Sequence, residues 1–295
     1  MTLQPGGTAS IVVGIATHNR PDVLRKAIGS ALHQSFVPLR VAVIDDASSD
    51  ETQTLCHDFK SVSWERWEQG RGYVRARNRM MMSAGEDYYV SLDDDSWFVQ
   101  GDEIAIAVDF LDRHPNVAAV AFDILSPDRP QQVPRGARRS VAMFIGCGHI
   151  LRLSTVKKLG GYTEFPGMYG AEEKDLCLRL IDAGYQIVKF DGVHVWHDKS
   201  SLARDIPRQH RSGVCNDLTL TLRRVPLAFL LPALAWKVPS HIAFALRTGL
   251  LRPCLRGFRD FVFAAAAVWR ARHPVRLSSM VRFRALTRSP REVAG

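Results

Sequence analysis

The first two hundred residues alternate between two hydrophobic patterns. Short runs rich in β-branched and aromatic residues, typical of buried strands, recur at 10–16, 39–46, 62–67, 88–92 and 116–122. Between them apolar residues return every three or four positions, which predicts helices over 18–34, 48–59, 73–84 and 102–114. Asn19 and Pro21 suit the N-cap and first turn of the first helix. The alternation predicts an α/β fold with a mainly parallel sheet flanked by helices.

Polar residues follow three of these predicted strands. They are Thr17–Arg20, Asp45–Asp46 and Asp93–Asp95. In sheets of this kind, ligands bind beyond the carboxyl ends of the strands. We therefore expect the three groups to meet in one site.

The three adjacent acids Asp93, Asp94 and Asp95 need a positive partner because their charges repel one another. A single oxygen would suffice to cap a helix, so the pattern favours a divalent cation, Mg²⁺ or Mn²⁺. Such an ion, held by few carboxylates, completes its shell with water and phosphate oxygens. Asp45 and Asp46 also fit a simpler interpretation, in which they end a strand and form an Asx turn.

Residues 201–295 differ in charge from the rest of the chain. Residues 1–199 hold 22 Lys/Arg against 26 Asp/Glu (22 − 26 = −4), whereas residues 200–295 hold 17 against 4 (17 − 4 = +13). The apolar runs 225–236 and 261–269 are shorter than the ~20 residues that span a bilayer. One helical face carries Leu255, Phe258, Val262, Ala265 and Trp269, with arginines beside it.

This basic, amphipathic helical extension is typical of a segment that lies in the membrane interface. A helical cap packed on the first domain is the alternative, and nucleic-acid binding is less favoured because no known module is visible. Five scattered cysteines without a CxxC pair predict reduced thiols. The N-terminus lacks a basic and apolar leader pattern. We therefore expect a cytoplasmic protein, peripheral at the inner face of the cell membrane.

Six segments, in this order and spacing, resemble family 2 glycosyltransferases with the GT-A fold. They are "SIVVGIATHNRPDVLRKAIGSALHQSF", "VAVIDDASSDET", "RGYVRARN", "LDDDSW", "GCGHILRLSTVKKLGGYTEFPGMYGAEEKDLCLRL" and "VHVWHDKS". The resemblance covers about residues 9–200. It implies a catalytic domain over 1–200, with nucleotide-sugar binding at about 9–100 and the acceptor and base region at about 141–200. It also implies inverting transfer of a sugar from a nucleotide diphosphate to an acceptor hydroxyl.

The resemblance also implies roles for single residues on the donor side. Ala16, Thr17, Asn19 and Arg20 would line the base and diphosphate, and Asp46 would accept a hydrogen bond from the base. Arg77 would lie near the nucleotide, although an arginine on a helix surface is an equal alternative. "DDD" corresponds to the DXD motif. Asp95 and His197 would bind the metal, and Asp93 or Asp94 would hold the ribose or a metal-bound water.

On the acceptor side, the resemblance makes Glu173 the base, in a position where the family usually has aspartate. Glu172 and Asp175 remain alternatives, because acids in the first turn of a helix are also favoured by its dipole. His197 matches the family's histidine better than His194. UDP-sugar is the favoured donor, with dTDP- or GDP-sugar possible. A glycan or lipid-linked hydroxyl in cell-envelope or polysaccharide synthesis is the expected acceptor.

Two other functional classes stay open at this point. A sugar-nucleotide nucleotidyltransferase also combines such a sheet with acidic metal ligands, but it usually has a Gly-rich phosphate loop after its first strand. Residues 16–22, "ATHNRPD", are not such a loop. A non-catalytic membrane- or glycan-binding module would tolerate loss of the acids, and their retention argues against it.

Overall fold

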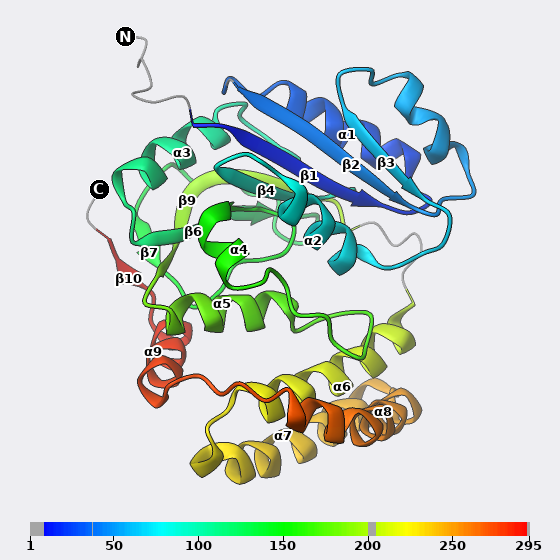
Figure 1. The fold of residues 1–295 in the computed structure, drawn as a ribbon, viewed down its shortest axis with the longest axis vertical. Helices are drawn as coiled ribbons and strands as arrows, with labels where there is room; N and C mark the ends of the chain where they lie inside the picture. The colour runs from blue at the N-terminus through cyan, green and yellow to red at the C-terminus, as the bar shows by residue number, and fades with distance from the viewer. Residues whose placement is uncertain (1–8, 37, 200–204, 294–295) are drawn as a thin grey trace.

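The computed structural model describes residues 9–36, 38–199 and 205–293. Its centre is one mixed sheet in the order β10-β7-β9-β6-β8-β4-β1-β2-β3, with β5 paired to β9 (Figure 1). The strands are β1 Ile11–Thr17, β2 Leu39–Asp46, β3 Ser63–Trp67, β4 Tyr88–Asp93, β5 Ser96–Phe98, β6 Val117–Leu125, β7 Arg138–Ser140, β8 His149–Arg152, β9 Gln186–His197 and β10 Arg291–Glu292. The predicted α/β class is confirmed.

The strands β3, β2, β1 and β4 are parallel, as the alternating pattern predicts. β8 then pairs antiparallel with both β4 and β6, so it joins this half to the parallel pair β6 and β9. The carboxyl ends of β1, β2 and β4 consequently lie at one edge of the sheet. These ends carry the polar groups that the sequence predicts to meet.

Helices cover both faces of the sheet. They are α1 Pro21–Leu32, α2 Tyr73–Ser83, α3 Glu103–Arg113, α4 Leu153–Lys158, α5 Glu172–Asp182, α6 Ile206–Arg224, α7 Leu227–Thr248, α8 Leu251–Arg270 and α9 Leu277–Arg288, with a 3-10 helix at Glu51–His57. Alternate residues of each strand face opposite layers. In β4, Tyr88 and Val90 pack with α1 and α3, whereas Tyr89 packs with α2 and α5.

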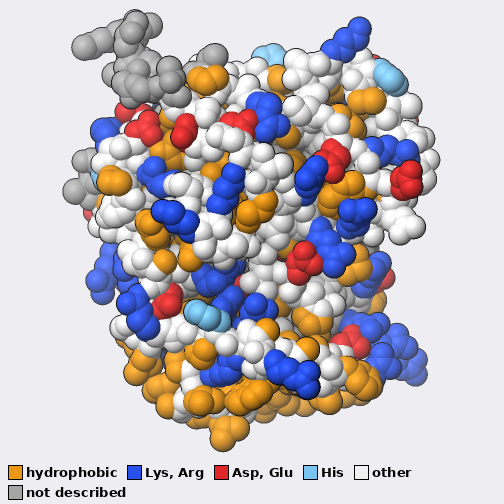
Figure 2. Space-filling model, viewed as in Figure 1, with side chains coloured by type: hydrophobic (Ala, Val, Ile, Leu, Met, Phe, Trp, Pro, Cys, Tyr) orange, Lys and Arg blue, Asp and Glu red, His pale blue; other side chains and the backbone are white. Residues whose placement is uncertain are grey.

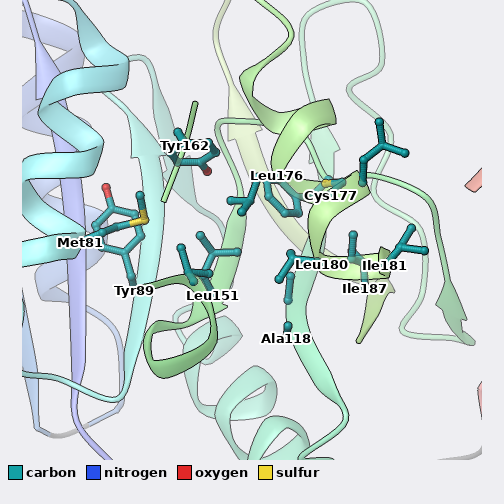
Figure 3. Packing of buried hydrophobic residues seen from close by; sticks show 14 of the residues in the cluster. Met81, Tyr89, Ala118, Leu151, Tyr162, Leu176, Cys177, Leu180, Ile181 and Ile187 are labelled. Carbon is teal, nitrogen blue, oxygen red and sulfur yellow. The ribbon is translucent and has the colours of Figure 1, made fainter. Parts of the chain in front are cut away.

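The hydrophobic core on the Tyr89 side of the sheet continues into the C-terminal helices. Figure 3 shows Met81 of α2 and Tyr89 of β4 on one side of this core, and Leu176 and Leu180 of α5 on the other. The same core includes residues of α6 and α9, so the C-terminal helices pack on the α/β part of the molecule. The predicted boundary at residues 200 and 201 lies outside the described residues.

Two local predictions need correction. Asn19 does not cap α1: its φ is 54°, the N-cap position is Arg20, and the Asn19 amide oxygen instead accepts the backbone N–H of Ser49 at 2.8 Å. The predicted helix over 48–59 is a 3-10 helix capped by Asp50, whose side chain accepts the N–H of Thr52. Asn19 thus makes a contact between two loops, whereas Asp50 makes a local cap.

The C-terminal region also differs from its sequence pattern. α7 runs for 22 residues and, by length and composition alone, is long and apolar enough to cross a membrane. We expected apolar runs too short for this, because Lys237 and Pro239 interrupt the pattern, yet the helix continues through them. At the chain's end, β10 adds to the sheet beside β7 and α9 packs under α5, which the sequence did not predict.

Candidate active site

A cavity of about 680 Å³ opens at the carboxyl ends of β1, β2 and β4. Its other walls come from the loop before β8, the N-terminal turn of α5 and the side of α6. Among the predicted site residues, those that line it are Ala16, Thr17, Arg20, Asp46, Arg77, Asp93, Asp94, Asp95, Glu173 and His197. Asn19 does not line the cavity. Its backbone N–H donates to Ser48 Oγ, and its side-chain oxygen accepts the N–H of Ser49. Its predicted contact with the nucleotide stays a prediction.

The middle acid of the triad, Asp94, is held by protein groups. Its carboxylate accepts hydrogen bonds from Thr17 Oγ1 at 3.0 Å and Arg20 Nη1 at 2.9 Å. Burial raises the pKa of Asp94 to about 6, although Arg20 opposes the shift. Arg20 also lies 3.5 Å from Asp95. Asp94 therefore fixes Arg20 at the floor of the cavity.

Asp95 lies against His197. Ser96 pairs with His197 in the antiparallel β5–β9 ladder, which brings the two side chains together. Asp95 Oδ1 is 3.3 Å from His197 Nε2, and the Asp95 side chain is almost fully buried. Carboxylate oxygens with an imidazole form a donor set that suits Mn²⁺ or another divalent ion. The residues present therefore fit the predicted metal.

A cysteine also lies close to these acids and to His197. Asp93, Cys147 and His197 each have one ligand atom within 4.8 Å of the other two. Asp93 is the most open acid of the triad, with a third of its side chain exposed. Sequence reasoning missed Cys147, because a single cysteine in "GCGH" carries no spacing signal. Its contact with the acids exists only after β8 is placed beside β4 and β6.

Arg77 links the two acidic centres. Its guanidinium pairs with Asp93, lies 3.3 Å from Glu173 Oε1 and stacks over the Tyr73 ring at 4.9 Å. Its side chain is only 4% exposed. The alternative of a helix-surface arginine is therefore wrong. Arg77 lines the cavity, but its fork is engaged by the protein's own carboxylates.

The two aspartates that end β2 behave differently. Asp45 is fully buried and its Oδ1 accepts the Ser48 N–H at 2.8 Å, which is the local turn that the simpler interpretation describes. Asp46 faces the cavity, and its oxygens accept the N–H groups of Arg71 at 2.6 Å and Gly72 at 2.8 Å. It therefore holds the loop before α2 against the rim.

The acids of α5 fall into three environments. Glu173 reaches the cavity with 23% of its side chain exposed. Glu172 is buried and accepts the Tyr73 hydroxyl. Asp175 does not line the cavity and is paired with Arg179 at 2.7 Å and Arg224 at 2.6 Å. Of the three, Glu173 is the carboxylate best placed to meet a substrate.

Electrostatics separate these acids further. Burial, followed by the neighbouring Glu172, raises the pKa of Glu173 to about 8, while Arg77 acts in the opposite direction. Asp175 is buried too, but the hydrogen bond from Arg224 and the charge of Arg179 lower its pKa below the ordinary value. A carboxylate with a raised pKa in a cavity is suited to accept a proton near neutral pH.

The two histidines of β9, His194 and His197, also lie in different environments. His194 is buried and hydrogen bonds to Gln100 at 2.7 Å, away from the cavity, so its role is structural. His197 faces the acids. The far wall of the cavity adds polar residues that the sequence did not single out, among them Tyr73, Gln209 and Asp217.

Curated relatives of this chain are glycosyltransferases. The chain is 26% identical over 217 residues to the pre-mycofactocin glycosyltransferase of Mycobacterium tuberculosis, covering 66% of this chain and 44% of that protein. It is 23% identical over 136 residues to the poly-β-1,6-N-acetyl-D-glucosamine synthase of Staphylococcus epidermidis, covering 45% and 33%. The chain spans less than half the length of these relatives.

Solved structures share the fold over nearly the whole chain. TarS residues 1–349 of S. aureus in complex with UDP-GlcNAc align with a TM-score of 0.62 at 17% identity, covering 94% of this chain and 83% of that one. The mannosyltransferase PcManGT of Pyrobaculum calidifontis, in complex with GDP-Man and Mn²⁺, aligns with a TM-score of 0.59 at 16% identity and the same coverage. Residues 12–158 match the model of glycosyl transferase family 2, and the chain belongs to this family.

Proposed function

We propose that this protein is a metal-dependent inverting glycosyltransferase that moves a sugar from a nucleotide diphosphate to an acceptor hydroxyl. The observation that supports this proposal most strongly is that one cavity contains two separate groups of carboxylates. Asp93 and Asp95 form a centre for a cation, and Glu173 forms a centre for a proton. Inverting transfer can use both, since positive charge stabilises the departing diphosphate while the base takes the proton of the attacking hydroxyl. Family membership and the fold of the solved relatives support the same reaction.

Asp95 and His197 would hold a divalent cation, which neutralises the negative charge of the departing diphosphate when bound. Arg20, fixed by Asp94, lies beside this centre and adds positive charge for a phosphate oxygen. Glu173 accepts the proton of the acceptor hydroxyl at its carboxylate oxygen. Arg77 holds Glu173 and Asp93 at fixed positions relative to each other.

The donor we favour is a UDP-sugar, with dTDP- or GDP-sugar as alternatives. Asp46 lies on the rim of the cavity, where its carboxylate can accept the N3–H of a uracil or thymine base. TarS binds UDP-GlcNAc, while PcManGT binds GDP-Man with Mn²⁺. We propose Mn²⁺ or Mg²⁺ as the ion.

A thermal-shift screen of UDP-, dTDP- and GDP-sugars, with and without Mn²⁺ or Mg²⁺, tests the donor site. A ligand that binds the folded state raises the melting temperature by mass action. We expect UDP-sugars to stabilise the protein, and more strongly with the metal ion. The same stabilisation with and without metal would contradict the proposed cation centre, and no stabilisation by any donor would contradict the function.

We also propose that the protein works at the inner face of the cell membrane, on a glycan or lipid-linked acceptor of envelope or polysaccharide synthesis. α7 turns Lys237 and His241 inward: Lys237 pairs with Asp217 of α6, and His241 Nε2 lies 3.1 Å from the same carboxylate. Outward it presents large apolar side chains, with Leu231 and Trp236 both more than 75% exposed. A helix of a water-exposed surface has the opposite arrangement.

α8 extends this apolar surface. Figure 2 shows hydrophobic side chains gathered at the end of the molecule that α7 and α8 occupy in Figure 1. Val262 and Phe263 of α8 are exposed there. Exposed arginines flank the surface, namely Arg247, Arg252, Arg256, Arg259 and Arg270. Exposed aromatic and aliphatic side chains beside arginines fit an anionic lipid surface. We call this the α7–α8 face.

A further inference from the structure

The thiol of Cys147 occupies an unusual position for a buried cysteine. Buried cysteines are most often small hydrophobic residues in apolar surroundings. Cys177 and Cys254 follow this rule, since both belong to clusters of buried hydrophobic side chains. Cys147 is only 1% exposed but, like the equally buried Cys215, belongs to none of these clusters. It lines the catalytic cavity instead.

The loop around Cys147 is held in place on both sides. A Cβ added to Gly146 would collide with Glu173 Oε1, and one added to Gly148 would collide with Ile124. Arg77 also donates a hydrogen bond to the Gly146 carbonyl at 3.3 Å. Gly146 therefore lets the backbone pass close to the acidic centre, and Gly148 lets it pass close to Ile124, so the loop that carries the thiol is closely packed on both sides.

That position is next to three other potential ligands. One ligand atom each of Asp93, Cys147 and His197 lies within 4.8 Å of the others, and Asp95 Oδ1 is 3.3 Å from His197 Nε2. These residues come from the end of β4, the loop before β8 and the end of β9. A site assembled from separate elements of a rigid sheet is pre-organised for an ion.

We infer that Cys147 is a direct ligand of the divalent ion, so that the centre combines carboxylate, imidazole and thiolate. This inference rests on the proposed function, because it concerns the same cation centre. On binding, a metal–sulfur bond forms and the thiol proton leaves to solvent. Sulfur prefers borderline-soft ions, so a thiolate ligand favours Co²⁺ or Zn²⁺ over Mg²⁺.

Cobalt spectroscopy on the full-length, reduced protein tests this directly. Co²⁺ alone is titrated in, then UDP is added. Visible d–d bands report that the ion is bound, and a near-ultraviolet sulfur-to-cobalt charge-transfer band reports a thiolate ligand. We expect both in the unmodified protein. Cys147→Ser and Cys147→Ala should lose the charge-transfer band and weaken Co²⁺ binding by roughly tenfold or more.

Mg²⁺ affinity, measured by competition against Co²⁺, should change less than Co²⁺ affinity in both variants, because Mg²⁺ does not take sulfur readily. Cys56→Ser is the matched control, since Cys56 is half-buried and does not line the cavity, and it should keep both signals. Circular dichroism checks that each variant is folded.

The outcomes separate this inference from the proposed function. Visible bands without a charge-transfer band would show a metal site that lacks sulfur, which overturns the role of Cys147 and leaves the proposed function intact. A charge-transfer band that persists in Cys147→Ala would also overturn it. No Co²⁺ binding at all, with or without UDP, would contradict both.

Discussion

The sheet end and the helical end of this molecule present their side chains in opposite ways. At the sheet end, polar groups converge inside a cavity, and α5 buries Leu176 and Leu180 while its first turn offers Glu173 to the cavity. At the helical end, α7 pairs Lys237 and His241 with Asp217 and turns Trp236 outward. One end concentrates charge and the other exposes apolar surface.

Both arrangements are unfavourable without a partner. Adjacent carboxylates repel; Arg20 and Arg77 relieve part of this repulsion, and a bound cation would relieve more of it. A large exposed apolar surface is rare on a monomeric soluble protein and usually marks a binding surface. The contrast is the reason that we propose chemistry at the sheet end and attachment at the helical end. Asp217 touches both, because it lines the cavity and binds Lys237 and His241 of α7.

Removing the base should have the largest effect. Glu173→Gln keeps the side-chain shape but cannot accept a proton, so turnover should fall roughly 10²-fold or more. Donor affinity, measured by calorimetry with UDP and Mn²⁺, should hardly change. Glu172→Gln is the control and should lose much less. A full-rate Glu173→Gln enzyme would move the base to another carboxylate.

Changing a residue of the cation centre should have the second-largest effect. Asp95→Asn removes a charged ligand at the end of a strand, so the apparent affinity for Mn²⁺ should fall by roughly 10- to 100-fold. Donor binding should then lose its metal dependence. Asp58→Asn is the matched control, since Asp58 forms a half-exposed pair with Arg25 far from the cavity. Unchanged metal dependence in Asp95→Asn would refute the assignment of the DXD motif.

The pH dependence of kcat/KM should show the raised pKa of Glu173. The base form is lost as the pH falls through the folded pKa, which burial and Glu172 raise to about 8. The rate should therefore fall about tenfold per pH unit well below that value. Because Glu172 contributes to the shift, Glu172→Gln should move the midpoint to lower pH. A flat profile between pH 6 and 9 would count against a carboxylate base.

Changes at the α7–α8 face should affect location and leave the chemistry intact. The full chain should sediment with anionic vesicles and be only partly released by salt, because apolar contacts are not screened. Trp236→Ser with Phe263→Ser should weaken vesicle binding several-fold, while Leu32→Ser on α1 should not. If the unmodified chain ignores vesicles, the face is not a membrane surface and a soluble acceptor becomes the better proposal.

Much of the sheet end could be predicted from the sequence because its rules are local. Strand periodicity places 39–46 and 88–92, and parallel topology then requires that Asp46 and Asp95 lie at the same edge. The environments of Arg77 and Cys147 could not be predicted. Arg77 is engaged by two carboxylates separated from it by 16 and 96 residues, and Cys147 approaches the acids through the pairing of β8.

The helical end was predicted less well because its pattern depends on tertiary contacts. Lys237 breaks the apolar run of α7 in the sequence, yet Asp217 neutralises it on the inner side, so the outer face stays apolar. The return of β10 to the sheet involves two residues and leaves no periodic signal. Asn19 was misassigned as a cap because only the fold shows its left-handed conformation.

The most direct test of the central claim follows phosphorus signals by NMR while the full-length protein turns over UDP-sugars with Mn²⁺ and anionic vesicles that carry lipid-linked acceptor. The account predicts that UDP accumulates at a rate that depends on the metal and on Glu173. Formation of UTP and sugar 1-phosphate from the UDP-sugar when pyrophosphate is added would instead indicate a nucleotidyltransferase. An unchanged donor spectrum across the UDP-, dTDP- and GDP-sugars, with the metal present, would contradict the claim that this cavity transfers sugar.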